Sequence, residues 1–240
     1  MLYTVRDECA SDLERTLDAV AAMGYEGVEV FDFHGHGAGR VRELLDERGL
    51  AIAGRHVSLG AAETRLSELA EEAGELGSSR LVVSWIEPPA SAAQAEEMAA
   101  RLGRAAEAAS ELGLELGFHN HDGEVRPLDD GLSLLERLVE GPLFLELDLG
   151  WAWWAGADPV ELLERARGRT PLVHIKDFRS AGERSFCPVG DGSVGYERVA
   201  PAAVRAGVEW LLVEQDEAEG SSLDAAERSL LALRSMLDAA

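Results

Sequence analysis

The sequence predicts an α/β protein, a single (β/α)8 TIM barrel over residues 1–240. Short apolar or β-branched runs alternate with longer Ala-, Leu-, Glu- and Arg-rich segments, whose apolar residues recur every three or four positions. Eight runs and eight segments fit within 240 residues, which suits parallel strands joined by right-handed crossovers into a closed barrel. No linker or low-complexity tract interrupts the alternation, so we expect one domain.

The apolar runs are the expected strands, at 1–5, 27–31, 51–57, 80–84, 114–119, 143–147, 172–175 and 210–214. The segments with helical spacing are the expected helices, at 11–23, 39–48, 63–76, 91–112, 128–139, 159–166, 196–206 and 222–237. Glycines follow three of these helices, at Gly24, Gly49 and Gly113. Glycine adopts a left-handed helix cap with the least strain, so these turns indicate the helix-to-strand end of a barrel.

A doubly wound open sheet is the alternative architecture. Dinucleotide-binding sheets carry a glycine-rich turn after their first strand, but residues 6–9 (RDEC) contain no glycine. The string GDGSVG at 190–195 satisfies GxGxxG by letter, yet it comes late and follows no apolar strand. The pattern therefore favours the barrel, and we interpret residues 190–195 as a flexible loop over its mouth.

The composition excludes several classes of function. With 45 acidic and 22 basic residues, the net charge of −23 would repel nucleic acid. No apolar run approaches the roughly 18–20 residues of a membrane span, and the charged amino terminus predicts no export signal, so a cytoplasmic location is expected. Cys9 and Cys187 lack a CxxC spacing and are interpreted as buried or incidental thiols.

Polar residues gather where the expected strands end, which is where TIM barrels build their active sites. All six histidines lie there and none lies in an expected helix: His34, His36, His56, His119, His121 and His174. Asp148 and Glu214 end two further strands. A ring of imidazoles and carboxylates suits a divalent ion such as Mn, Co, Zn, Fe or Mg. Singly, His174 could be a core histidine and the acids could be capping or ion-paired groups.

Lysine occurs once, at Lys176, among 22 basic residues. It lies two positions after His174 and could hold a substrate oxygen or a developing enolate charge. An arginine-rich coding bias is the other explanation.

Several strings resemble the sugar phosphate isomerase/epimerase family, within the xylose isomerase-like TIM barrel superfamily, and the resemblance runs nearly from end to end. The strings FHNHDGE at 118–124 and VHIKD at 173–177 are the most specific. The others are LYTVR at 2–6, GYEGVE at 24–29, LELD at 145–148 with Trp151, AGADP at 155–159, VGDG at 189–192 and VEQD at 213–216. Relatives include ketose 3-epimerases, hydroxypyruvate isomerase, inosose dehydratase, dehydroshikimate dehydratase and keto-sugar hydratases.

The resemblance implies a metal held by residues at the ends of the last four strands. Asp148, His174 and Glu214 match three of the typical ligands. His119 stands where many relatives have glutamate, so the fourth ligand is His119, Glu124 or water. This departure weakens the aldose-ketose isomerase interpretation, and His121 holds the place of a proton-transfer histidine of the dehydratase and keto-sugar branch.

These residues predict a metal-dependent isomerase or epimerase that removes a proton next to a carbonyl of a sugar, keto-sugar or polyol. His121 is the expected base, with Glu214 sharing the work and Lys176 holding charge. The expected substrate contacts are Lys176, Glu29, His34, His56 and Trp151. A dehydratase-type lyase and a non-catalytic sugar-binding barrel are the alternatives, and an endonuclease IV-like activity is disfavoured by charge. A homo-oligomer is left open.

Overall fold

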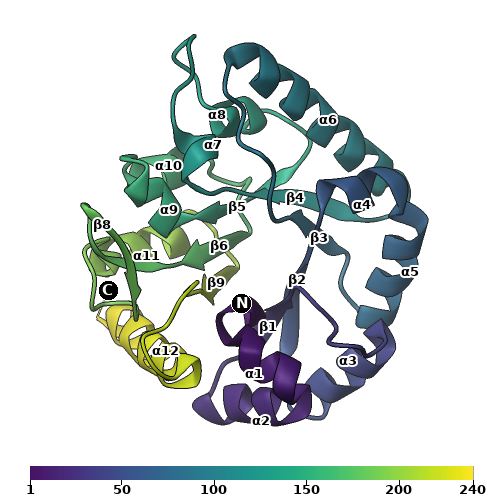
Figure 1. Cartoon of the computed structure of the whole chain (residues 1–240), viewed down its shortest axis with the longest axis vertical. Coiled ribbons are helices and arrows are strands. Elements are labelled where there is room, and N and C mark those ends of the chain that lie inside the picture. Colours follow the sequence, from purple (N-terminus) through teal and green to yellow (C-terminus); the bar gives the residue numbers. More distant parts are fainter. Residues whose placement is uncertain (240) are drawn as a thin grey trace.

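The computed structural model describes residues 1–239 as a ring of parallel strands with helices around the outside (Figure 1). Seven strands pair in the order β1-β2-β3-β4-β5-β6-β9 and form a nearly closed barrel, which confirms the predicted fold class. Their bounds are β1 Gly27–Val30, β2 Ala51–Val57, β3 Arg80–Val83, β4 Glu115–His119, β5 Phe144–Asp148, β6 Leu172–Ile175 and β9 Trp210–Val213.

The helices cover the outer faces of the strands (Figure 1). Their bounds are α1 Arg6–Ser11, α2 Leu13–Met23, α3 Ala38–Asp46, α4 Leu59–Thr64, α5 Leu66–Leu76, α6 Ala92–Glu111, α7 Asp122–Val125, α8 Leu134–Leu138, α9 Leu149–Trp154, α10 Pro159–Arg165, α11 Tyr196–Arg205 and α12 Ser222–Asp238. The three glycines expected at helix ends, Gly24, Gly49 and Gly113, all have positive φ. Their left-handed backbone confirms the predicted turns.

The strand expected at residues 1–5 is wrong. This segment is a 3-10 helix, η1 Leu2–Val5, that lies beside β1 and α12. Leu2 and Val5 are buried while Tyr3 is exposed, and residues three apart share a face of a 3-10 turn. In a five-residue run this pattern cannot be told from strand alternation.

Several other segments differ from the expectation, among them the short helices α1, α7 and α9, which were not predicted. The helix expected at 63–76 is two helices, α4 and α5, which meet at Arg65. The helix expected at 128–139 is helical only over Leu134–Leu138. An antiparallel hairpin that the sequence did not predict, β7 Asp177–Ser180 and β8 Glu183–Cys187, follows β6.

The glycine-rich segment 190–195 is fastened to β7, which corrects its interpretation as a flexible loop. The Asp177 carboxylate accepts backbone N–H groups from Gly190, Gly192 and Val194 at 2.9–3.2 Å. A Cβ on Gly192 would lie 2.2 Å from Asp177 Oδ1. Glycine is therefore required there by the close approach of the backbone to a carboxylate.

The barrel interior contains two layers of side chains. The layer toward the amino ends of the strands is apolar and consists of Ala53, Val82, Leu172 and Leu212, with Phe144 and Trp210 packed against them. The layer toward the carboxyl ends consists of histidines and carboxylates. Side chains two residues apart along a strand point to the same side of the barrel wall. Successive inward-facing residues of one strand therefore lie in different layers.

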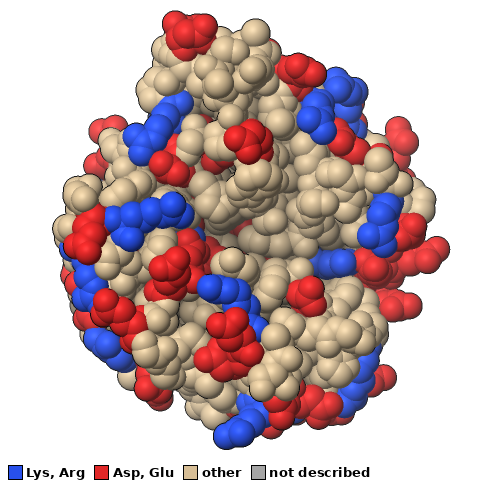
Figure 2. Space-filling model, in the orientation of Figure 1, with Lys and Arg blue, Asp and Glu red and all other residues tan. Residues whose placement is uncertain are grey.

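The outer surface carries much of the acidic charge. Figure 2 shows charged side chains mostly toward the edge of this face, over the outer helices, and a hollow near its centre. Among residues 1–239, no helix is long and apolar enough to cross a membrane. Cys9 and Cys187 are both buried free thiols, as expected.

Candidate metal centre and active site

Five strands and the residue directly after a sixth bring the polar side chains of the upper layer together inside the barrel. Along β6, Val173 and Ile175 face the helices, so His174 points inward. The strand register places His119 beside Glu146 and Asp148 beside His174. The remaining members of the layer are Glu29 on β1, His56 on β2 and Glu214 directly after β9. Most of these groups are less than 6% exposed.

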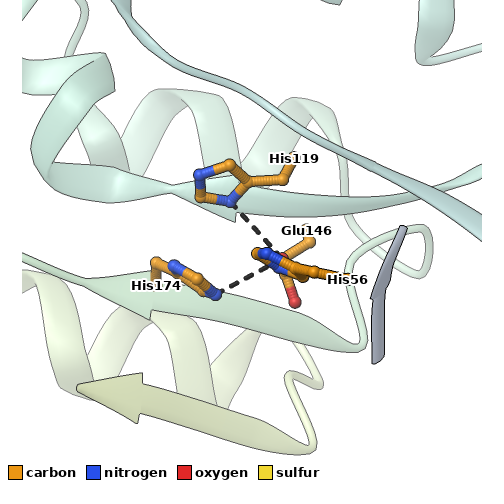
Figure 3. Close-up of side chains that lie close together, drawn as sticks. All are labelled: His56, His119, Glu146 and His174. Atoms are coloured by element: carbon orange, nitrogen blue, oxygen red, sulfur yellow. Dashed lines mark hydrogen bonds and ion pairs between the residues drawn. The ribbon is translucent and has the colours of Figure 1, made fainter. Parts of the chain in front are cut away.

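Three imidazoles converge on one carboxylate oxygen, Glu146 Oε2 (Figure 3). His56 Nε2 lies 2.8 Å from this oxygen, His174 Nε2 3.3 Å and His119 Nδ1 3.4 Å. Glu29 Oε2 also contacts this group, at 2.9 Å from His174 Nε2 and 3.2 Å from His56 Nε2. The inner half of the layer therefore holds two carboxylates among three imidazoles.

The other half of the layer surrounds the single lysine. Lys176 Nζ lies 3.1 Å from Asp148 Oδ2, 2.9 Å from Glu214 Oε2 and 2.8 Å from Asp216 Oδ1. His174 Nδ1 lies 2.7 Å from the same Glu214 oxygen. The ammonium group therefore lies among three carboxylates, and the contact of Lys176 with substrate stays a prediction.

Burial and opposite charges set the ionisation of this layer. Burial alone would raise the pKa of Glu146, but His174 and His56 outweigh it and hold that pKa well below its ordinary value. Burial would likewise lower the pKa of Lys176, yet Asp148, Glu214 and Asp216 raise it. Burial is opposed at His56 by Glu29 and Glu146, which raise its pKa to about 9. The buried charges are thus stabilised in pairs.

His121 differs from the other buried histidines because it has no carboxylate against its ring. Burial, and then the charges of His119 and Lys176, lower its pKa to about 2, so the imidazole is neutral. Its ring centroid lies 5.0 Å from that of His119 and 5.8 Å from that of Trp151. A neutral imidazole beside a metal-ligand candidate can accept a proton.

A cavity of about 600 Å³ opens above the charged layer. His56, His119, His121 and Glu214 line its floor, and Trp151 lines its wall. Aromatic rings and two arginines also line the cavity: Tyr3, Phe31, Trp85, Arg6 and Arg184. This combination suits a small polar ligand with an apolar ring face.

The structure brings together most of the site residues that the sequence predicted. Those in or beside the charged layer are Glu29, His56, His119, His121, Asp148, Trp151, His174, Lys176 and Glu214. His34 and His36 are not among the residues that line the cavity. His34 packs against Phe31 in the loop after β1, with a centroid distance of 5.4 Å, and His36 is exposed. Glu124 accepts the backbone N–H of His121 at 2.8 Å and belongs to neither group of possible metal ligands.

Sequence reasoning missed Glu146 and Asp216. In the string LELD at 145–148, alternation puts Glu146 and Asp148 on one face of β5, while Leu145 and Leu147 pack against the helices. Two carboxylates two residues apart in an apolar strand were the available signal. Asn120 was also missed, and its side chain accepts the Asp148 N–H at 3.1 Å.

Two overlapping groups of four side chains could hold a metal ion. One is His119, Asp148, His174 and Glu214, which is the set that the sequence predicted, and the other is His56, His119, Glu146 and His174. Within residues 1–239, three buried atoms of these sets have no hydrogen-bond partner: His119 Nδ1, Glu146 Oε1 and Asp148 Oδ2. Buried polar atoms rarely stay unpaired, so the donor sets fit a bound cation.

The fold and the site define a TIM barrel with a candidate metal centre at the carboxyl ends of its strands. A family model for xylose isomerase-like TIM barrels matches residues 17–236. The chain belongs to this family, which confirms the resemblance seen in the sequence.

The proteins that are similar to this chain differ in their named activities. It is 26% identical over 246 residues to inosose dehydratase from Geobacillus kaustophilus, covering 85% of this chain and 80% of that protein. A solved sugar phosphate isomerase/epimerase from Parabacteroides distasonis superposes with a TM-score of 0.84 at 21% identity, covering 96% and 90% of the two chains. An L-ribulose 3-epimerase gives 0.75 at 19% identity, covering 95% and 90%. A xylose isomerase-like barrel from Mycobacterium smegmatis in complex with magnesium gives 0.68 at 16% identity, covering 96% and 90%.

Proposed function

We propose that this protein is a divalent-metal-dependent enzyme that removes a proton next to the carbonyl of a sugar, keto-sugar or cyclic polyol. The observation that carries the proposal is the position of the His121 imidazole, which lines the same cavity as His119 and Glu214 of the predicted metal set. A base and an electrophilic centre on one cavity wall are the two parts that proton abstraction next to a carbonyl requires.

The outer ligand set would hold the ion, through His119, Asp148, His174 and Glu214. A divalent ion held there would supply Lewis acidity to a substrate carbonyl and its neighbouring hydroxyl. Lys176 neutralises part of the carboxylate charge of this set and keeps Asp148 and Glu214 in place. It thereby reduces the repulsion between closely spaced carboxylates.

His121 takes the role of general base. Its low pKa leaves it unprotonated at neutral pH, and Glu124 fixes its backbone through the 2.8 Å bond to the His121 N–H. A base with so low a pKa is weak, and a divalent ion in the outer set would compensate by acidifying the C–H next to the substrate carbonyl.

The cavity lining supports a polyhydroxylated substrate. Trp151 and the aromatic rim offer flat apolar surfaces for the C–H face of a sugar ring. His56 lies at the cavity floor and can contact a hydroxyl, whereas Glu29 orients His56 and His174 from below. Substrate contact by His34 stays a prediction.

Loss of the β-hydroxyl after proton removal would make the enzyme a lyase. This outcome is supported by the inosose dehydratase relative, which aligns over 85% of the chain. Return of the proton would make it an isomerase or epimerase, the outcome predicted from the sequence and consistent with the L-ribulose 3-epimerase fold. Both outcomes use the same first step.

Proton exchange in D2O tests the common step. We expect the protein with Mn²⁺, Co²⁺ or Mg²⁺ to exchange the C–H next to the carbonyl of an inosose or a ketopentose, followed by NMR, and an enone absorbance reports dehydration. His121→Gln should slow exchange by roughly 10²–10⁴-fold and leave Mn²⁺ affinity unchanged. The matched control His36→Gln changes an exposed histidine and should have no effect.

Full exchange by His121→Gln would eliminate His121 as the base. Absence of exchange with every ion and substrate, together with calorimetric binding of the same sugars, would instead establish the non-catalytic sugar-binding barrel.

A further inference from the structure

Two histidine rings separate the charged layer into an inner and an outer half. His119 presents Nδ1 to Glu146, at 3.4 Å, and Nε2 to Asp148, at 4.0 Å. His174 presents Nε2 to Glu146, at 3.3 Å, and Nδ1 to Glu214, at 2.7 Å. Each ring therefore faces an inner carboxylate with one nitrogen and an outer carboxylate with the other.

We propose that the barrel contains a second metal site, deeper than the outer set, formed by His56, His119, Glu146 and His174 and selective for Zn²⁺ over Mn²⁺. The inner site uses the opposite nitrogens of the same two imidazoles. It offers three nitrogens and one oxygen, whereas the outer set offers two of each.

The spacing of the inner donors matches a tetrahedral ion. Bonds of about 2.0–2.1 Å from zinc to its ligands place the ligand atoms about 3.3 Å apart in a tetrahedron. Two of the distances to Glu146 Oε2 are 3.3 and 3.4 Å, and the third, to His56 Nε2, is 2.8 Å. The three distances to Glu146 are therefore close to those of a tetrahedral ion, and one ligand atom from each of the four side chains lies within 4.8 Å of the others.

The surroundings of the inner set suit a divalent cation. His119 Nδ1 and Glu146 Oε1 are buried and unpaired among the described residues. Glu29 lies against His56 and His174 and supplies a second negative charge, so an ion of charge +2 would be balanced by Glu146 and Glu29. The Glu29 side chain packs against the backbone of Gly54, because a Cβ on Gly54 would lie 3.2 Å from Glu29 Oε1.

The two sites exclude each other. A neutral imidazole has one lone pair for a metal, so His119 and His174 can serve the inner or the outer position but not both at once. Nitrogen-rich sites favour Zn²⁺ and Cu²⁺, and oxygen-rich sites favour Mn²⁺ and Mg²⁺. Zinc held in the inner site would therefore leave the outer set without two of its four ligands.

X-ray absorption of the zinc-loaded wild-type protein tests the proposal directly. Multiple scattering from imidazole rings counts histidine ligands, and we expect three for Zn²⁺ at one ion per chain. The outer set would give two, and two ions per chain would overturn the mutual exclusion. Because the wild-type protein is used, this result does not depend on whether any variant folds.

Matched variants then separate the two sites. His56→Gln should weaken Zn²⁺ binding by more than about tenfold and change Mn²⁺ affinity by less than threefold, because His56 belongs to the inner set alone, whereas Asp148→Asn should do the reverse. His36→Gln is the control. Equal losses for both ions in both variants would overturn the proposal. These experiments measure metal binding and not turnover. A protein that holds zinc through three histidines but shows no proton exchange would therefore refute the proposed activity and leave the second metal site standing.

Discussion

The two layers inside the barrel are built on the same strands and have opposite chemistry. β5, β6 and β9 each contribute an apolar side chain to the lower layer and an ionisable one two residues later: Phe144 and Glu146, Leu172 and His174, Leu212 and Glu214. Both layers are almost fully buried. The difference between them is a difference in what burial does to each side chain.

The lower layer gains stability from burial and the upper layer loses it. An apolar side chain contributes roughly 1.5–3 kcal/mol when it leaves water, whereas a buried charge is tolerated only with an opposite partner. Every acid of the inner half has imidazole partners within 3.4 Å. The burial of the apolar layer therefore offsets the free-energy cost of burying the polar layer beside it.

Removing one inner carboxylate should break this balance most strongly. We expect Glu146→Ala to lower the free energy of unfolding of the metal-free protein by about 3–5 kcal/mol, because His56, His119 and His174 would lose the carboxylate on which all three converge. Urea denaturation followed by circular dichroism measures the change. Glu140→Ala, at an exposed carboxylate, is the control and should cost less than about 0.5 kcal/mol. A loss below 1 kcal/mol for Glu146→Ala would mean that the imidazoles are neutral without metal.

The matching change in the lower layer should cost less and should not depend on metal. We expect Leu172→Ala to lower the free energy of unfolding by roughly 2–4 kcal/mol, through lost burial and a cavity beside Val82 and Leu212. The same loss should be measured with and without Zn²⁺, whereas the loss for Glu146→Ala should grow when Zn²⁺ stabilises the wild type. Leu231→Ala, where the side chain is 59% exposed, is the control. A metal-dependent loss at Leu172 would show that the layers are coupled.

The contrast between layers also explains what the sequence could predict. Apolar runs predicted all seven parallel strands of the barrel. The outer face of each strand is buried against helices, and this burial requires apolar residues that are visible in the sequence. The run at 1–5 has a similar apolar composition, yet its residues Leu2–Val5 form a 3-10 helix. The hairpin β7–β8 was missed because its tip is exposed and polar, at Arg179, Glu183 and Arg184, and each strand has only two buried residues, which is too short a pattern to predict a strand.

Site residues were predictable where a strand ends and much less so within a strand. Asp148, His174 and Glu214 stand at strand ends, the place where barrels carry their chemistry. Glu146 lies inside β5, and its role depends on which face of the strand points inward. That choice is made by tertiary packing of Leu145 and Leu147 against helices, which no single segment specifies.

A buried acid without a cationic partner completes the comparison. Burial raises the pKa of the Cys9 thiol to about 12, and Glu8 adds to the shift, whereas burial with imidazole partners leaves the pKa of Glu146 low. A group whose folded pKa is raised stays protonated until the pH passes that value. We therefore expect Cys9 to react with a thiol reagent at pH 8 at least about 10³-fold more slowly in the folded than in the urea-unfolded protein, because the thiolate is the reactive form.

Cys187, whose pKa burial raises to about 11, should react about tenfold faster than Cys9 at equal access. Mass spectrometry of the alkylated peptides distinguishes the two sites, and rapid labelling of Cys9 at pH 8 would show that its burial is broken by local opening rather than set by the fold.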